Sequence, residues 1–233
     1  ASLLLPALSS ARARAKSMDC LSRLKQMTTA MSMYSLDHAD WIPYRNVGDW
    51  RNGTNYLEHL AGYMFNPDIG DLNSDNLTEA ATKFYVCPSE YRGSNYRMSY
   101  VINGHRTGSW GQEFGVTYSN SGSGTFADGT AYQGRPRKLT SIENTAETMA
   151  LMCSPHTGSW GQRYGDDSAS FHRAPIQNGA LRMSLLHRDS ANWGFVDGHV
   201  AWMSLDQAIG TGTGWTPSSL VNPFGIWTVN PND

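Results

Sequence analysis

The sequence predicts an α+β fold: a long N-terminal helix packed on an antiparallel β-sheet with long loops. Three observations indicate it. Residues 8–36 contain no glycine or proline. The 233 residues include 23 Gly, 8 Trp, 11 Tyr and 7 Phe, which favours turn-rich β structure. Asp197-Gly198 lies between two apolar runs, a strong hairpin signal. We therefore divide the chain into a helix, residues 1–36, and a β-rich head, residues 37–233.

The predicted helix carries an apolar stripe in its second half only. Apolar residues recur there at alternating intervals of four and three positions, starting at Cys20. This spacing puts them on one face of a helix, which we expect to hold the sheet. After Cys20, the stripe consists of Leu24, Met27, Met31 and Tyr34. The half before Cys20 is rich in Ala and Ser, so we predict that it projects toward neighbouring subunits through Leu4, Leu8, Ala11, Ala15 and Met18.

Charge and hydropathy exclude some classes of partner. The net charge of −2 gives no electrostatic footprint for nucleic acid. Residues 1–25 carry five basic residues and one acidic residue, so a basic helix precedes an acidic head. No run reaches the roughly 18 apolar residues of a membrane-spanning helix. The chain starts on Ala1-Ser2-Leu3 without Met, with an apolar patch at this edge, and we expect a missing upstream segment.

The head is expected to contain one short helix and several short strands. The helix covers residues 57–64, and the strands cover residues 84–87, 96–102 and 147–153. A two-residue type I′ turn at Asp197-Gly198 would place Phe195 opposite Val200. The resulting apolar face consists of Trp193, Phe195, Val200 and Trp202.

The three cysteines form no C-x-x-C pair, which argues against a zinc ribbon or a thioredoxin-type site. We predict a disulfide between Cys20 and Cys87 that ties the helix to the sheet. Pairing of Cys87 with Cys153 is the alternative, and a fully reduced chain is the third possibility.

Catalytic motifs are absent from the sequence, and we expect no enzyme activity. No H-E-x-x-H, G-x-S-x-G or phosphate-loop pattern occurs. His187, Asp197 and His199 could converge on a metal, and a hydrolase could use His187 and Asp197. We favour a structural interpretation, in which Asp197 serves the turn and His187 bonds nearby backbone. A weak calcium candidate begins at Asp71, Asn73 and Asp75, but it lacks the glycine and glutamate of a calcium loop. No other cofactor is predicted.

Two matched loops repeat Thr-Gly-Ser-Trp-Gly-Gln at residues 107–112 and 157–162. Their Trp110 and Trp160 could contact a ligand or a neighbouring subunit, since aromatic residues are enriched at interfaces. Packing on the head's own core is the other interpretation. A secreted surface module that binds glycan through these loops is the alternative function.

Several motifs resemble one family. Residues 3–15, Leu-Leu-Leu-Pro-Ala-Leu-Ser-Ser-Ala-Arg-Ala-Arg-Ala, look like a type IV pilin-like N-terminal helix just after its hydrophobic part. Three motifs resemble planctomycete- or lentisphaera-type bacterial pseudopilins: Cys20-Leu-Ser-Arg-Leu-Lys-Gln, Cys87-Pro-Ser, and His187 separated by nine residues from Asp197-Gly198.

The resemblance implies a structural homopolymer. Such a chain would be a subunit of an extracellular type IV pilus-like filament, or of the pseudopilus of a type II secretion system. Its missing hydrophobic segment would hold it in the inner membrane before assembly, and it would then polymerise through its N-terminal helix. Its location would be an extracellular filament, the periplasm or the cell surface.

Overall fold

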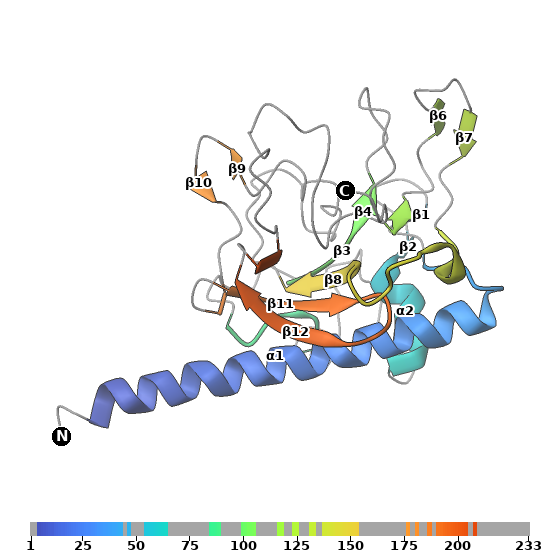
Figure 1. The fold of residues 1–233 in the computed structure, drawn as a ribbon. Coiled ribbons are helices and arrows are strands. Elements are labelled where there is room, and N and C mark those ends of the chain that lie inside the picture. The colour runs from blue at the N-terminus through green and yellow to red at the C-terminus, as the bar shows by residue number, and fades with distance from the viewer. Residues whose placement is uncertain are drawn as a thin grey trace.

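A computed structural model describes the long helix and the sheet that packs on it (Figure 1). The described residues are 4–43, 46–47, 54–64, 84–89, 99–105, 116–118, 123–125, 131–133, 137–153, 176–177, 180–181, 186–187, 190–204 and 207–208. Helix α1 spans Leu4–Asp37. A four-stranded antiparallel sheet lies against its second half. The α+β class and the long N-terminal helix are therefore confirmed.

The central sheet has the strand order β12-β11-β8-β3. Its strands are β3 (Tyr100–Ile102), β8 (Met149–Cys153), β11 (Ser190–Phe195) and β12 (Val200–Ser204). Each neighbouring pair is antiparallel, and the register shifts at a bulge between Gly194 and Phe195. Strand β8 lies inside the sheet. All five of its residues are buried, because both of its faces are covered.

Smaller elements surround this sheet. Helix α2 spans Tyr56–Met64 and packs on α1, and a 3-10 turn, η1, spans Leu139–Ser141. The short strand pairs are β1 (Asn46–Val47) with β2 (Thr54–Asn55), β4 (Gly104–His105) with β5 (Thr117–Tyr118), β6 (Ser123–Thr125) with β7 (Ala131–Gln133), and β9 (Ile176–Gln177) with β10 (Ala180–Leu181). The predicted strand at residues 84–87 is wrong, because Phe84 and Tyr85 have helical backbone.

The core lies on both faces of the sheet. On the helix side, the stripe residues Leu24, Met27 and Met31 are fully buried and Tyr34 is nearly so. Burial of each such side chain contributes about 1.5–3 kcal/mol to folding. A second cluster covers the opposite face and consists of Met149, Met152, Ala191, Trp193, Phe195 and Ala208. The sheet thus joins the helix to the rest of the head.

The predicted register of the last hairpin is wrong by one residue. Gly194 pairs with Val200, and Trp193 pairs with Ala201. Gly198 adopts a positive φ of 89°, and it donates a hydrogen bond to the Phe195 carbonyl. The turn therefore holds more than two residues, and a shift of one residue moves side chains to opposite faces of the strand.

This shift divides the four side chains that were expected to form one face. Trp193 and Phe195 are buried on the side away from α1, whereas Val200 packs against the core on the helix side. Trp202 is 54% exposed. Only the strands and the position of the turn follow the sequence expectation.

Candidate metal centre

Four buried side chains from four segments of the chain converge beside α1. They are Cys20, Cys87, Cys153 and His187, and their sulfur and imidazole nitrogen atoms all lie within 4.8 Å of one another. Each residue is at most 4% exposed. Among the described residues, this is the one group of His, Cys, Asp or Glu side chains that could hold a metal ion.

The first two thiols are positioned by the packing of α1 and the sheet. Cys20 opens the buried stripe of the helix, one turn before Leu24. Cys153 ends the central strand β8 and pairs with Tyr100 of β3. Because α1 packs on β8, the end of the strand meets the helix at Cys20.

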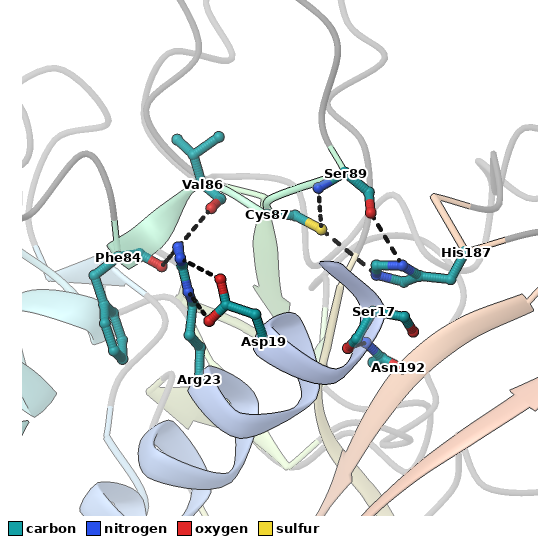
Figure 2. A network of polar contacts seen from close by, with 9 residues as sticks. All are labelled: Ser17, Asp19, Arg23, Phe84, Val86, Cys87, Ser89, His187 and Asn192. Carbon is teal, nitrogen blue, oxygen red and sulfur yellow. Dashed lines mark hydrogen bonds and ion pairs between the residues drawn. The ribbon is translucent and has the colours of Figure 1, made fainter. Parts of the chain in front are cut away.

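The third thiol is brought to the helix by Arg23. This guanidinium donates hydrogen bonds to the carbonyl oxygens of Phe84 and Val86, over 3.3 and 3.1 Å, and both residues lie within three positions of Cys87. Asp19, one turn earlier in α1, orients Arg23 through an ion pair of 2.8 Å (Figure 2). A charged pair on the helix thus holds the 84–89 segment in place.

The imidazole of His187 completes the cluster. Its Nε2 lies 3.5 Å from Cys87 Sγ, and its Nδ1 lies 3.3 Å from Ser89 Oγ (Figure 2). The Ser89 backbone N–H also donates to Cys87 Sγ over 3.4 Å. A ring whose Nδ1 is engaged by a neighbouring group has its orientation fixed, as is usual for histidines that ligate metals through the other nitrogen.

The contact between Cys87 and His187 has the length expected around a tetrahedral zinc ion. With Zn–S of about 2.3 Å and Zn–N of about 2.0–2.1 Å, two tetrahedral ligand atoms are about 3.5–3.8 Å apart. The Cys87–His187 separation of 3.5 Å falls in this range. Three cysteines and one histidine form a donor set found in structural zinc sites.

The pKa values of the three thiols are shifted in different directions. Burial opposes ionisation of Cys20, but hydrogen bonds from Cys153 and Cys87 and the proximity of His187 outweigh it and lower the pKa of Cys20. The hydrogen bond with Cys153 lowers the pKa of Cys87, whereas that with Cys20 and burial raise it, to about 12 in balance. Burial, followed by its bonds to the other two thiols, raises the pKa of Cys153. The surroundings therefore favour ionisation of Cys20 over ionisation of Cys87 and Cys153.

The predicted disulfide is not formed in the structure. All three cysteines are free, so neither the Cys20–Cys87 bridge nor the Cys87–Cys153 alternative is present. The structure does bring these residues together, but as members of one four-residue group. A disulfide prediction considers cysteines two at a time, so it does not reveal a group of three cysteines and one histidine. The signal that could have found it was the co-occurrence of Cys20, Cys87-Pro-Ser and His187 among the motifs of the resemblance.

The other candidate residues lie elsewhere. Asp197 Oδ1 accepts a hydrogen bond from the His199 backbone N–H and lies 2.7 Å from His199 Nδ1. Asp197 therefore serves the hairpin turn, and these contacts do not involve His187. The side chain of His187 faces Cys87 and Ser89, whereas the backbone N–H of His187 donates to the backbone carbonyl of Ser190. The predicted assembly residues Leu4, Leu8, Ala11, Ala15 and Met18 are exposed on α1. Outside the described residues lie Trp110, Trp160, Asp71, Asn73 and Asp75.

Comparisons with known proteins give no relative. No protein-family model, curated protein or solved structure matches this chain. Among the described residues, no helix has the length and apolar character needed to cross a membrane.

Proposed function

We propose that the chain is the repeating subunit of a pilin-like extracellular filament or of a type II secretion pseudopilus, and that it polymerises through α1. One observation carries the proposal: the first half of α1 extends beyond the head, and its large apolar side chains are exposed (Figure 1). Leu4, Leu5, Leu8 and Met18 are 73%, 68%, 68% and 63% exposed.

The second half of α1 buries side chains against the head of the same chain, but the first half does not. Every buried residue of α1 lies at Cys20 or beyond it. A helical segment that buries no apolar face is marginal in water, because most helix stability in proteins comes from packing of such a face. At 1.5 Å per residue, the 34 residues of α1 span about 50 Å, so the helix reaches well past its own head. Neighbouring subunits would supply the missing contacts.

The residues of this projecting half suit helix-to-helix packing. Leu4 and Leu8 lie one turn apart, and burial of each would contribute about 1.5–3 kcal/mol. Ala11 and Ala15 continue at the same spacing, and such small side chains allow close approach of two helices. Contacts between different surfaces of successive subunits generate open helical filaments when the rotation between subunits does not close a ring. The proposed role is structural and needs no catalytic step.

A matched pair of substitutions tests this proposal. Leu8→Glu places a charge on the projecting half, and Leu36→Glu places the same charge on an equally solvent-facing leucine, 82% exposed, at the head end of the same helix. Neither side chain is buried, so both variants should fold with unchanged thermal stability. We expect Leu8→Glu to reduce the sedimentable extracellular fraction at least tenfold, while Leu36→Glu retains it. Equal sedimentation of both variants and the parent chain would refute assembly through this half of α1.

A further inference from the structure

We propose that Cys20, Cys87, Cys153 and His187 bind one Zn²⁺ ion in a closed structural site, and that this ion fixes the direction in which α1 leaves the head. The inference stands on the buried cluster and holds whether or not the chain forms filaments. Four protein ligands fill a tetrahedral shell completely, so no position stays open for water or substrate. The site is accordingly structural in character.

The donor chemistry selects the ion. Thiolate and imidazole ligands favour zinc, whereas calcium and magnesium require oxygen ligands. The four side chains are buried, and no carboxylate is among them. Binding involves no redox change: Zn²⁺ replaces the thiol protons, which pass to solvent, and the complex of three thiolates and one neutral imidazole carries a charge of −1.

Contacts around the cluster are arranged as in established metal sites. The Ser89 N–H donates to Cys87 Sγ, which would disperse thiolate charge. Ser89 Oγ engages His187 Nδ1 and leaves Nε2 directed at the sulfur of Cys87 (Figure 2). Outer contacts of this kind orient the ligands and tune their basicity.

The position of the cluster gives the ion its role. Cys20 is the first buried residue of α1, so it marks the point where the projecting half begins. At the same point, Asn192 of β11 donates to the Ser17 carbonyl over 3.0 Å, and Arg23 holds the 84–89 segment. A bound ion would join α1 to the end of β8, to that segment and to the residues before β11. Four segments distant in the sequence would then be fixed at the junction.

Metal analysis combined with thiol titration tests whether the four-residue site holds zinc. The full chain is purified without reductant or chelator, its zinc is measured by mass spectrometry, and its thiols are titrated in denaturant with EDTA. We expect one zinc and three titratable thiols per chain. A metal-free chain with one thiol would identify a disulfide instead, and a metal-free chain with three thiols that binds no added zinc would also overturn the proposal.

Histidine variants test the ligand set. We expect His187→Ala to lose zinc, and His187→Cys, which restores a fourth ligand, to retain it. His199→Gln is the matched control, because His199 bonds to Asp197 in the hairpin and is not part of the cluster. As a readout independent of folding yield, Co²⁺ bound to the metal-stripped parent chain should show visible bands of tetrahedral cobalt and thiolate-to-cobalt charge transfer. An octahedral cobalt spectrum would contradict the proposed site.

Hydrogen exchange tests the role at the junction. Amide exchange is compared in the zinc-loaded and zinc-stripped chain by peptide mass spectrometry. We expect faster exchange after stripping in residues 17–24 and 84–89, and unchanged exchange in residues 196–204 of the hairpin. Uniform acceleration throughout the chain, or no acceleration near Cys20, would overturn the assignment of the ion to the junction.

Discussion

Gly194 of β11 lies so close to Thr28 of α1 that a Cβ atom on the glycine would be 2.6 Å from Thr28 Cγ2. The Leu24 side chain is also near, at 3.2 Å from that Cβ position. The strand and helix backbones therefore approach each other closely above the sheet. This approach sets the depth at which the helix stripe is buried, and with it the position of Cys20.

Gly194→Ala should destabilise the fold by about 1–3 kcal/mol, because the added methyl overpacks the helix–sheet contact. Thermal or urea unfolding measures the change. Gly62→Ala is the control, since nothing lies within 4 Å of a Cβ there and alanine favours the helix by about 0.5–1 kcal/mol. Thr28→Ser removes Cγ2 and keeps the hydroxyl, so it should partly rescue Gly194→Ala. Additive losses in the double variant would show that the contact is not the cause.

Arg23→Lys should lower the free energy of unfolding by about 1.5–3 kcal/mol, because lysine cannot keep both carbonyl contacts and the pair with Asp19 at once. Asp19→Asn removes only a half-exposed ion pair, which is worth about 0–1 kcal/mol. Urea unfolding of both variants checks the order. A larger loss in Asp19→Asn than in Arg23→Lys would contradict the anchoring of the 84–89 segment by Arg23.

Asp40 should contribute a pH-dependent share of stability. Hydrogen bonds from the Thr140 hydroxyl and backbone N–H lower the pKa of Asp40 below its ordinary value of 3.8, with nearby Lys138 acting in the same direction. Because the folded-state pKa is the lower one, the stabilisation is complete well above pH 3.8 and disappears as the pH falls through the folded-state pKa.

Asp40→Asn is the matching variant, because asparagine tolerates the positive φ of 73° at this position. We expect the parent chain to exceed the variant in unfolding free energy by a constant amount from pH 5 to 7, and this difference to shrink below pH 4. Urea unfolding across the pH range measures it. A difference that stays constant down to pH 2 would contradict the assignment.

The two tryptophans of the last hairpin should differ sharply. Trp193 is 1% exposed and donates from its indole nitrogen to the Met203 carbonyl, whereas Trp202 is 54% exposed. Trp193→Ala should cost about 3–5 kcal/mol, and Trp202→Ala much less. Equal losses, measured by thermal unfolding, would support the one-face arrangement expected from a two-residue turn.

Local sequence patterns predicted the elements better than their pairing. The four-and-three spacing from Cys20 to Tyr34 identified the buried helix face because a helix repeats its geometry every turn. Asp197-Gly198 located the hairpin turn, but a left-handed Gly198 is compatible with more than one loop length, and loop length sets the register. The sequence alone could not choose between these turns.

The candidate metal centre depends on contacts that no local pattern encodes. Cys20, Cys87, Cys153 and His187 are separated by 67, 66 and 34 positions, so their meeting follows from the packing of α1 on β8 and from the Arg23 contacts. Spacing rules for zinc sites detect ligands carried in pairs on short loops. Single ligands on four separate segments become visible only in the fold.

Electron cryomicroscopy of the native extracellular fraction tests the central claim most directly. The proposed assembly requires regular helical fibres with one subunit per repeat, in which α1 packs along the fibre axis and Leu4 and Leu8 are buried between neighbouring helices. Fibres whose projecting half of α1 faces solvent, or a chain present solely as dispersed monomers, would contradict it.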